Sequence, residues 1–418
     1  MRSDSLLCSK IQKRALSSFS IWVGVIACWG SVLPWPMWKS EYFPFFLLML
    51  FTATRAIFWN ENYTWATVVS MVATIAFAFV YSQLFTNGLI ISIYQVVYAI
   101  VPIVAFLTLQ EHERYVFLKR FINFFSVIAL ASVIAFFAHF FIDLPYFIIH
   151  HTNSFYAPFK NYIFFVITQN SDFGWFTRFS SVYSEPGHMS MVCAILLYIN
   201  GYSFRKWQNI TMTICLIWTF SLAGYLLFLG GIILHVVAKS KKILLTLSKI
   251  ISVTIILLTL GFIYYSPQNN DMFSIKILSR LEFDENNGIA GNNRNSIWFN
   301  QYYDEFLSSQ DKWLGIGRGE LGKRFGGTGN ASYKNYVLGN GVIGTIAIFF
   351  LMGTYLFCYP SRKGLGLMIL LSISFIQRPY FLWAIECFPY VAALSSWYIH
   401  DDYQKQNIII AKQSTILA

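Results

Sequence analysis

Charged side chains are scarce in this sequence of 418 residues. They make up 12% of the chain, whereas hydrophobic residues make up 56%. A soluble protein usually carries about 25% charged residues. Apolar stretches of about 18 residues or more recur along the chain, and each is long enough to cross a bilayer as a helix. The composition therefore excludes an ordinary soluble protein and predicts an all-α polytopic membrane protein.

Motifs for metals, nucleotides and disulfides are lacking as well. The two longest segments between apolar runs, 143–187 and 266–334, contain none of the six cysteines, so no disulfide framework or cysteine-based metal site is expected there. No zinc motif, P-loop or dinucleotide fingerprint is present, and no carboxylate cluster in these segments resembles a metal site. No internal repeat or cleavable signal peptide is apparent. We expect neither a metal nor a cofactor.

Basic residues are in excess, with a net charge of +11, and they gather in short segments between apolar runs. Lysine and arginine concentrate in the cytoplasmic loops of membrane proteins, so this pattern indicates orientation and does not point to nucleic acid. The segments 2–14 and 114–120 and the pair Arg205–Lys206 are therefore expected in the cytoplasm.

The apolar runs predict one integral membrane domain over 1–418 with about 12 transmembrane helices, and about 11 to 13 are compatible with the pattern. The runs lie at 18–35, 42–58, 63–83, 88–108, 121–142, 188–204, 209–238, 243–265, 335–358 and 365–400. The run 209–238 is expected to hold two short helices that turn near Ser221–Gly224. The run 365–400 is expected to turn at Arg378–Pro379, because proline disfavours helix at the residue before it.

This count places both termini in the cytoplasm and two large loops on the same outer face. The first loop covers 143–187, and the second covers 266–334. The stretch "NSIWFNQYYDEFLSS" predicts that the second loop is partly helical. The bilayer is the first expected partner.

An unusual group of polar residues stands at the end of the first loop, in "RFSSVYSEPGHM". Pro186 suits the first position of a helix, with Glu185 as its cap. The start of that helix presents free N–H groups and favours anions. Glu185 is expected to be ionised and His188 neutral. Two interpretations stay open: a substrate site made with Arg178, or a structural ion pair between Arg178 and Glu185.

The second loop supplies further cations. Guanidinium groups bind phosphate through two parallel hydrogen bonds, so Arg294 and Arg318, together with Lys334 and Arg178, suit a lipid-linked pyrophosphate. For Arg294 and Arg318 a role as solvated surface charges stays open. Arg378 interrupts an apolar run, and ionisable residues in such runs are functional candidates. Solvated surface charges are expected at Lys312, Lys323 and Arg324.

The order of these features resembles the bacterial O-antigen polymerase and ligase superfamily. The matching stretches are "RFSSVYSEPG", "TFSLAG", "NNRNSIW", "LGIGRG" and "YKNYVLGNGVIG", and the similarity covers roughly residues 175–360. Two positions depart from the family pattern. Lys334 stands where family members, notably the ligases, often carry histidine, and "SLAG" replaces the "S-R-G" of many relatives.

The resemblance implies a membrane glycosyltransferase of GT-C-like architecture at the periplasmic face of the bacterial inner membrane. It would join oligosaccharide repeat units carried on undecaprenyl pyrophosphate, without a metal, with one lipid-linked glycan as donor and another as acceptor. Lys334 and Asn335 of the closing motif would bind substrate along with Arg178, Arg294, Arg318 and Arg378. A polysaccharide chain-length regulator is a potential partner.

Other interpretations remain at this point. Glu185 or His188 is the general base, or Glu185 orients Arg178 instead. A second interpretation is a ligase that transfers glycan to lipid A core. Lys334 weakens it, because ligases often carry histidine at that position. A lipid-linked oligosaccharide flippase is an alternative of another class. Transporters usually place polar groups at the bilayer midplane and often show internal repeats, whereas the polar groups here gather in two loops on one face.

Overall fold

The computed structural model describes residues 2–34, 42–57, 62–83, 86, 88–150, 158–168, 177–240, 283–284, 288–289, 296–325 and 332–399. This part of the chain is mostly helical. The helices are α1 (Arg2–Gly30), α2 (Tyr42–Ala56), α3 (Trp65–Ser82), α5 (Leu89–Gln95), η2 (Val96–Ile100), α6 (Val101–Leu107), α7 (Glu111–Ala138), α8 (Pro186–Asn200), α9 (Trp207–Trp218), α10 (Leu222–Lys239), α13 (Ile297–Ser308), η5 (Gln310–Lys312), α14 (Arg318–Phe325), α15 (Tyr333–Cys358) and α16 (Arg362–Gln377). Residues 384–399 form a further helix.

Among the described residues, 5 helical stretches are long and apolar enough to cross a membrane: α3, the continuous α5–η2–α6, α7, α10 and α15. Shorter apolar helices lie at 15–30, 42–56 and 186–200. The structure thus supports a helical membrane protein. The predicted span 243–265 and most of the second loop before Ser296 lie outside the described residues.

Both predicted helix pairs are present. α9 ends at Trp218 and α10 begins at Leu222, where the Ser221 hydroxyl accepts a hydrogen bond from the Gly224 N–H. α16 ends at Gln377, and the next helix starts after Trp383. The second loop contains α13 where the sequence predicts helix, capped by Ser296.

The first loop departs from the all-α expectation. It holds a three-stranded antiparallel sheet of β1 (Phe147–Ile149), β2 (Phe159–Asn161) and β3 (Val166–Thr168), in the order β1-β2-β3. Short strands give a weak alternation signal, so periodicity does not reveal them. A smaller pair, β4 (Phe283–Asp284) and β5 (Gly288–Ile289), lies in the second loop.

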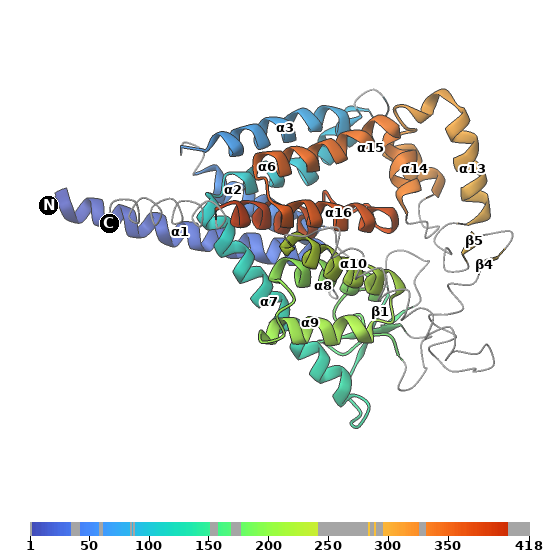
Figure 1. The fold of residues 1–418 in the computed structure, drawn as a ribbon, viewed down its shortest axis with the longest axis horizontal. Helices are drawn as coiled ribbons and strands as arrows, with labels where there is room; N and C mark the ends of the chain where they lie inside the picture. The colour runs from blue at the N-terminus through green and yellow to red at the C-terminus, as the bar shows by residue number, and fades with distance from the viewer. Residues whose placement is uncertain are drawn as a thin grey trace.

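The helices form a bundle with two different ends (Figure 1). β1, α13 and α14 lie at one end, called the loop end below, and the N-terminal end of α1 projects from the opposite end. At that opposite end the buried Arg114 guanidinium ties three elements together. It donates to the Tyr359 hydroxyl at 2.7 Å, to Thr67 Oγ1 at 3.1 Å and to the Leu107 carbonyl at 2.7 Å.

α8 is the central helix of the described bundle. Every residue from Gly187 to Ile199 is buried, which explains why this stretch is apolar on all sides. α9, α10 and α16 pack around it. Because α8 begins at Pro186, directly after the first loop, its N-terminus faces the loop end.

α15 is broken near its start at Gly341, whose φ of 70° and ψ of 179° suit glycine alone. The segment that precedes α14 packs into this break. The Ile343 N–H donates to the Trp313 carbonyl at 3.1 Å, and the Ile316 N–H donates to the Leu338 carbonyl at 2.9 Å. A Cβ atom at Gly315 would lie 2.6 Å from the Gly339 oxygen. The two glycine-rich motifs of the second loop therefore pack against each other.

Candidate functional site

The start of α8 has the predicted geometry. Glu185 is the cap, with extended φ and ψ of −131° and 135°, and Pro186 occupies the first helical turn. The Glu185 carbonyl accepts the His188 N–H at 3.0 Å. Glu185 retains 25% of its side-chain exposure, so its carboxylate reaches the surface of the bundle.

Glu185 forms an ion pair with Arg378, which lies at the end of α16. The pair joins Glu185 Oε2 to Arg378 Nη2, and the Arg378 side chain is 4% exposed. Arg178 was the expected partner of Glu185 in the ion-pair interpretation, whereas Arg378 pairs with Glu185 in the structure. The two residues are 193 positions apart in the chain.

Arg378 lies directly against the first turn of α8. A Cβ atom at Gly187 would be 2.5 Å from Arg378 Nη2 and 3.2 Å from its Cζ. A side chain at position 187 would therefore require the Arg378 guanidinium to move away from the N-terminus of α8. The glycine of the "SEPG" motif leaves room for the guanidinium in its present position.

His188 is buried in the same region. Its Nε2 lies 3.4 Å from the Tyr380 hydroxyl, and the two rings are 5.6 Å apart. Tyr380 stacks on Trp383 at 4.1 Å, and the Arg378 guanidinium lies 5.9 Å from the Tyr380 ring. His188 therefore faces the turn after α16.

Arg178 lies at the turn between α9 and α10. Its Nε donates to the Thr219 carbonyl at 3.0 Å, and the neighbouring Phe179 N–H donates to the Trp218 carbonyl at 2.9 Å. A cation at the C-terminal end of a helix is favourable, because the last carbonyls carry partial negative charge. Arg178 thus has a structural contact that its position in the sequence does not reveal.

Arg318 starts α14 and is held by neighbouring elements. It donates to the Tyr81 hydroxyl on α3 and to Asn340 Oδ1 at 3.2 Å, and its Cζ lies 4.1 Å from the Tyr81 ring. The Tyr336 ring lies 5.8 Å from the Arg318 guanidinium and 5.0 Å from the Phe375 ring. Arg318 therefore connects through two aromatic rings to α16, one turn before Arg378.

Lys334 and Asn335 have contacts with other elements than this pair. Lys334 donates to Asn300 Oδ1 at 2.9 Å and lies 4.9 Å from the Tyr303 ring, so it joins α13 to the start of α15. Burial raises the pKa of Tyr303 to about 12, which keeps the ring neutral beside that cation. The Asn335 N–H donates to the Ser332 carbonyl at 3.0 Å. Arg294 lies outside the described residues.

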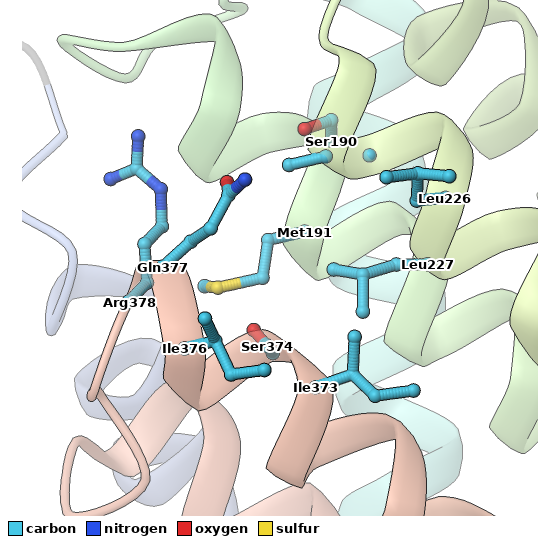
Figure 2. A pocket seen from close by; sticks show the side chains of 11 residues that line it. Ser190, Met191, Leu226, Leu227, Ile373, Ser374, Ile376, Gln377 and Arg378 are labelled. Atoms are coloured by element: carbon cyan, nitrogen blue, oxygen red, sulfur yellow. The ribbon is translucent and has the colours of Figure 1, made fainter. Parts of the chain in front are cut away.

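A cavity of about 200 Å³ opens beside the ion pair (Figure 2). Its walls are mostly apolar side chains of α8, α10 and α16, and Arg378 and Gln377 stand at one side of it. Its lining residues include Met191, Leu226, Leu227, Ile373 and Ile376. In the part of the chain that the structure describes, Ser374 Oγ and Gln377 Oε1 are buried without a hydrogen-bond partner. The cavity is therefore apolar along its length and polar where it meets Arg378.

A second carboxyl group, Glu386, lies near Arg378 and was not among the predicted site residues. It sits in the first turn of the helix 384–399 and is 2% exposed. Its Oε1 has no hydrogen-bond partner among the described residues, and the charge of Arg378 acts on it. The rule that singled out Arg378, an ionisable residue within an apolar run, applies equally to Glu386.

The geometry combines a buried guanidinium, a helix N-terminus, a partly exposed carboxylate and an apolar cavity. These are the elements of a site for an amphiphilic anion. Comparison of the chain with protein-family models, with curated proteins and with solved structures gives no match.

Proposed function

We propose that this protein is a membrane glycosyltransferase that polymerises glycan repeat units carried on undecaprenyl pyrophosphate at the periplasmic face of the bacterial inner membrane. The observation that carries the proposal is the apolar cavity that ends at Arg378 beside the start of α8. A polyprenyl pyrophosphate is apolar except for its anionic head. The cavity suits part of its chain, and the guanidinium suits its pyrophosphate.

The same site supports catalysis by fixed charges. In the proposed reaction, the acceptor hydroxyl oxygen attacks the anomeric carbon of the donor, and the bond from that carbon to the pyrophosphate oxygen breaks. Negative charge then grows on the leaving pyrophosphate. Arg378 and the N–H groups of α8 stabilise that charge without the participation of a metal.

Glu185 is our proposed general base. Its carboxylate pairs with Arg378 in this structure, so an incoming pyrophosphate competes for the guanidinium. Once released, the carboxylate accepts the proton that the attacking hydroxyl loses. His188 is the alternative base, and its contact with the Tyr380 hydroxyl keeps it within the same cluster.

The arrangement of the chain supports chemistry at a surface. The described parts of both long loops lie at one end of the bundle (Figure 1), as the polymerase interpretation requires. Arg178, Arg318, Lys334, Asn335 and Arg294 keep a proposed part in substrate binding. Arg378 is the strongest of the proposed binding residues, because it alone among the described ones lines the cavity.

Removal of the Arg378 guanidinium tests this function. In cells that lack the native gene, Arg378→Ala should lower polymer formation about 100-fold or more, and Arg378→Lys should restore it poorly because ammonium cannot form two parallel hydrogen bonds. The readout is glycan length on lipopolysaccharide at matched protein levels. Arg324→Ala is the control, because this exposed arginine at the loop end contacts only neighbouring surface groups in the described chain.

The pattern of products separates the alternatives. Polymerase loss leaves one repeat attached to the core, whereas ligase or flippase loss removes every repeat. Normal long-chain glycan from Arg378→Ala, or loss of all repeats, contradicts the proposed function.

A further inference from the structure

The turn between β2 and β3 in the first loop has an unusual backbone and unusual exposure. Ile163 has φ of 71°, a left-handed conformation that β-branched residues rarely adopt. Ile163 and Phe164 are 53% and 52% exposed, whereas Phe165 is fully buried and stacks on Tyr162 at 4.5 Å. The strained turn therefore presents two large apolar side chains outward.

This hairpin tip lies beside the middle of a predicted membrane span. The Ser132 hydroxyl of α7 donates to the Phe164 carbonyl at 2.6 Å. Ser132 stands six residues before Ala138, where α7 ends, which corresponds to about 9 Å along the helix. In Figure 1, α7 runs obliquely and reaches no farther toward the loop end than α10 and α16. The tip is therefore level with a membrane-spanning part of the bundle.

The neighbouring surface of α7 is apolar at this depth. Leu130 and Ile134 lie at the depth of the buried Ser132, on the opposite face of the helix, and are 40% and 61% exposed. Beyond α7, the exposed Phe141 and Ile142 continue the apolar surface. If α7 spans the bilayer, Ile134 marks the depth of the lipid chains on one side of the helix, and the exposed Ile163 and Phe164 lie at a similar depth on the side of Ser132.

The backbone N–H groups at the hairpin tip have hydrogen-bond partners. An unsatisfied backbone group is costly in hydrocarbon, so non-helical backbone at membrane depth needs its polar groups bonded or covered by protein. The Tyr162 N–H donates to the Phe165 carbonyl at 2.9 Å, the Ile163 N–H to Asn161 Oδ1 at 2.7 Å and the Phe164 N–H to the Tyr162 carbonyl at 2.9 Å. The three N–H groups at the tip are thus bonded within the hairpin.

Charge appears only at the base of the hairpin. Lys160 lies three residues before the tip, about 10 Å along a strand, and its Nζ is 5.4 Å from the Tyr146 ring. Lysine and tyrosine are typical of the membrane–water interface. The pair therefore fits the headgroup level. The hairpin tip then lies about 10 Å deeper, in the hydrocarbon of the same leaflet.

We propose that the β2–β3 hairpin is a re-entrant anchor whose tip, Ile163 and Phe164, inserts into the hydrocarbon of the outer leaflet. The anchor also holds the segment that leads to Glu185. The Val166 N–H donates to the Ser181 carbonyl at 2.9 Å, the Ser180 hydroxyl donates to the Val166 carbonyl at 3.2 Å, and the Ser181 hydroxyl donates to Ser132 at 2.8 Å. The described strands β2 and β3 and residues 180–181 are thereby fixed at the bilayer surface, independently of which substrate the protein binds.

Depth-dependent fluorescence quenching tests the anchor in the full-length protein. Cys8 and Cys358 are replaced by serine, since the other four cysteines are buried, and an environment-sensitive fluorophore is attached to Ile163→Cys or Phe164→Cys. Ile134→Cys on α7 is the lipid-facing control, and the exposed Asp304→Cys on α13 is the aqueous control. The proteins are reconstituted in phosphatidylcholine vesicles.

Labels at 163 and 164 should lose fluorescence to lipids that carry a nitroxide on the upper acyl chain and should resist iodide, as the label at 134 does. The ratio of lipid to iodide quenching should exceed that at 304 several-fold. Iodide quenching at 163 and 164 that matches position 304 overturns the anchor. Protection from both quenchers also overturns it, because protein would then cover the tip.

Discussion

At the scale of single residues, three neighbouring groups act on the charge of Arg378. It caps the C-terminal end of α16, whose last carbonyls favour a cation, and it pairs with the Glu185 carboxylate. It also faces the positive end of α8, which is unfavourable for a cation and favourable for an anion. Removal of one partner of a buried pair leaves the other charge uncompensated. An anionic substrate can therefore replace Glu185 without leaving Arg378 unpaired.

Glu185→Gln distinguishes a base from an orienting partner. An amide cannot accept the proton of the acceptor hydroxyl. If Glu185 is the base, Glu185→Gln should therefore lower polymer formation by about 100- to 10,000-fold while lipid-linked substrate still binds. If Glu185 instead orients Arg378, the amide oxygen of the variant still accepts a hydrogen bond from Arg378, and part of the activity should survive. The measurements are glycan length and binding of lipid-linked donor to purified protein.

His188→Ala is the companion variant, because His188 lies in the same cluster. Full-length polymer from Glu185→Gln, combined with its loss in His188→Ala, moves the base to the histidine and refutes the assignment of Glu185.

At the scale of elements, the break in α15 determines where Arg318 lies. The segment from Trp313 to Gly317 packs into the break, and the Gln83 side chain of α3 donates to the Leu314 and Gly339 carbonyls. This contact sets α14 against α3 and α15, so residues 313–325 of the second loop are held beside the start of α15. Glycine is required because a side chain at the break would meet backbone atoms.

Gly341→Ala should loosen this contact. The new Cβ would overlap the Trp313 carbonyl oxygen, and φ of 70° with ψ of 179° is a conformation that costs a non-glycine residue about 1–3 kcal/mol. We expect a lower midpoint of thermal unfolding in detergent and faster proteolysis between α13 and α15. Gly322→Ala on α14 is the control, because its Cβ would meet no atom within 4 Å. Equal behaviour of the two variants contradicts this account of the break.

Local sequence signals predicted where helices start and end, but not the short strands of the first loop or the contacts between distant residues. Pro186 and Pro379 mark a helix start and a helix end, and both positions are as predicted. The partner of Glu185 was not predictable, because Arg378 is 193 positions away and nothing in either neighbourhood encodes the pairing. Arg178 illustrates the reverse case, since nearness to Glu185 in sequence suggested a contact, while its guanidinium bonds to the end of α9.

At the scale of the whole molecule, the two ends of the bundle differ in chemistry. The end opposite the loops is tied by buried arginines, with Arg55 bonded to Glu113 at 3.2 Å and to the Thr108 carbonyl at 2.7 Å. The loop end carries the Glu185–Arg378 pair and the described strands of the first loop. Orientation in the membrane therefore decides whether the site can meet lipid-linked glycans outside the cytoplasm.

Thiol labelling of spheroplasts tests that orientation. In the background with Cys8→Ser and Cys358→Ser, Asp304→Cys on α13 should react with a membrane-impermeant maleimide, because basic connecting segments are retained on the cytoplasmic side and α13 lies at the opposite face. Lys206→Cys and Arg362→Cys are exposed in the structure and should react only after the membrane is opened. Labelling of position 206 or 362 in sealed spheroplasts, or protection of position 304, would place the Glu185–Arg378 pair on the cytoplasmic side, where periplasmic polymerisation by this site is impossible.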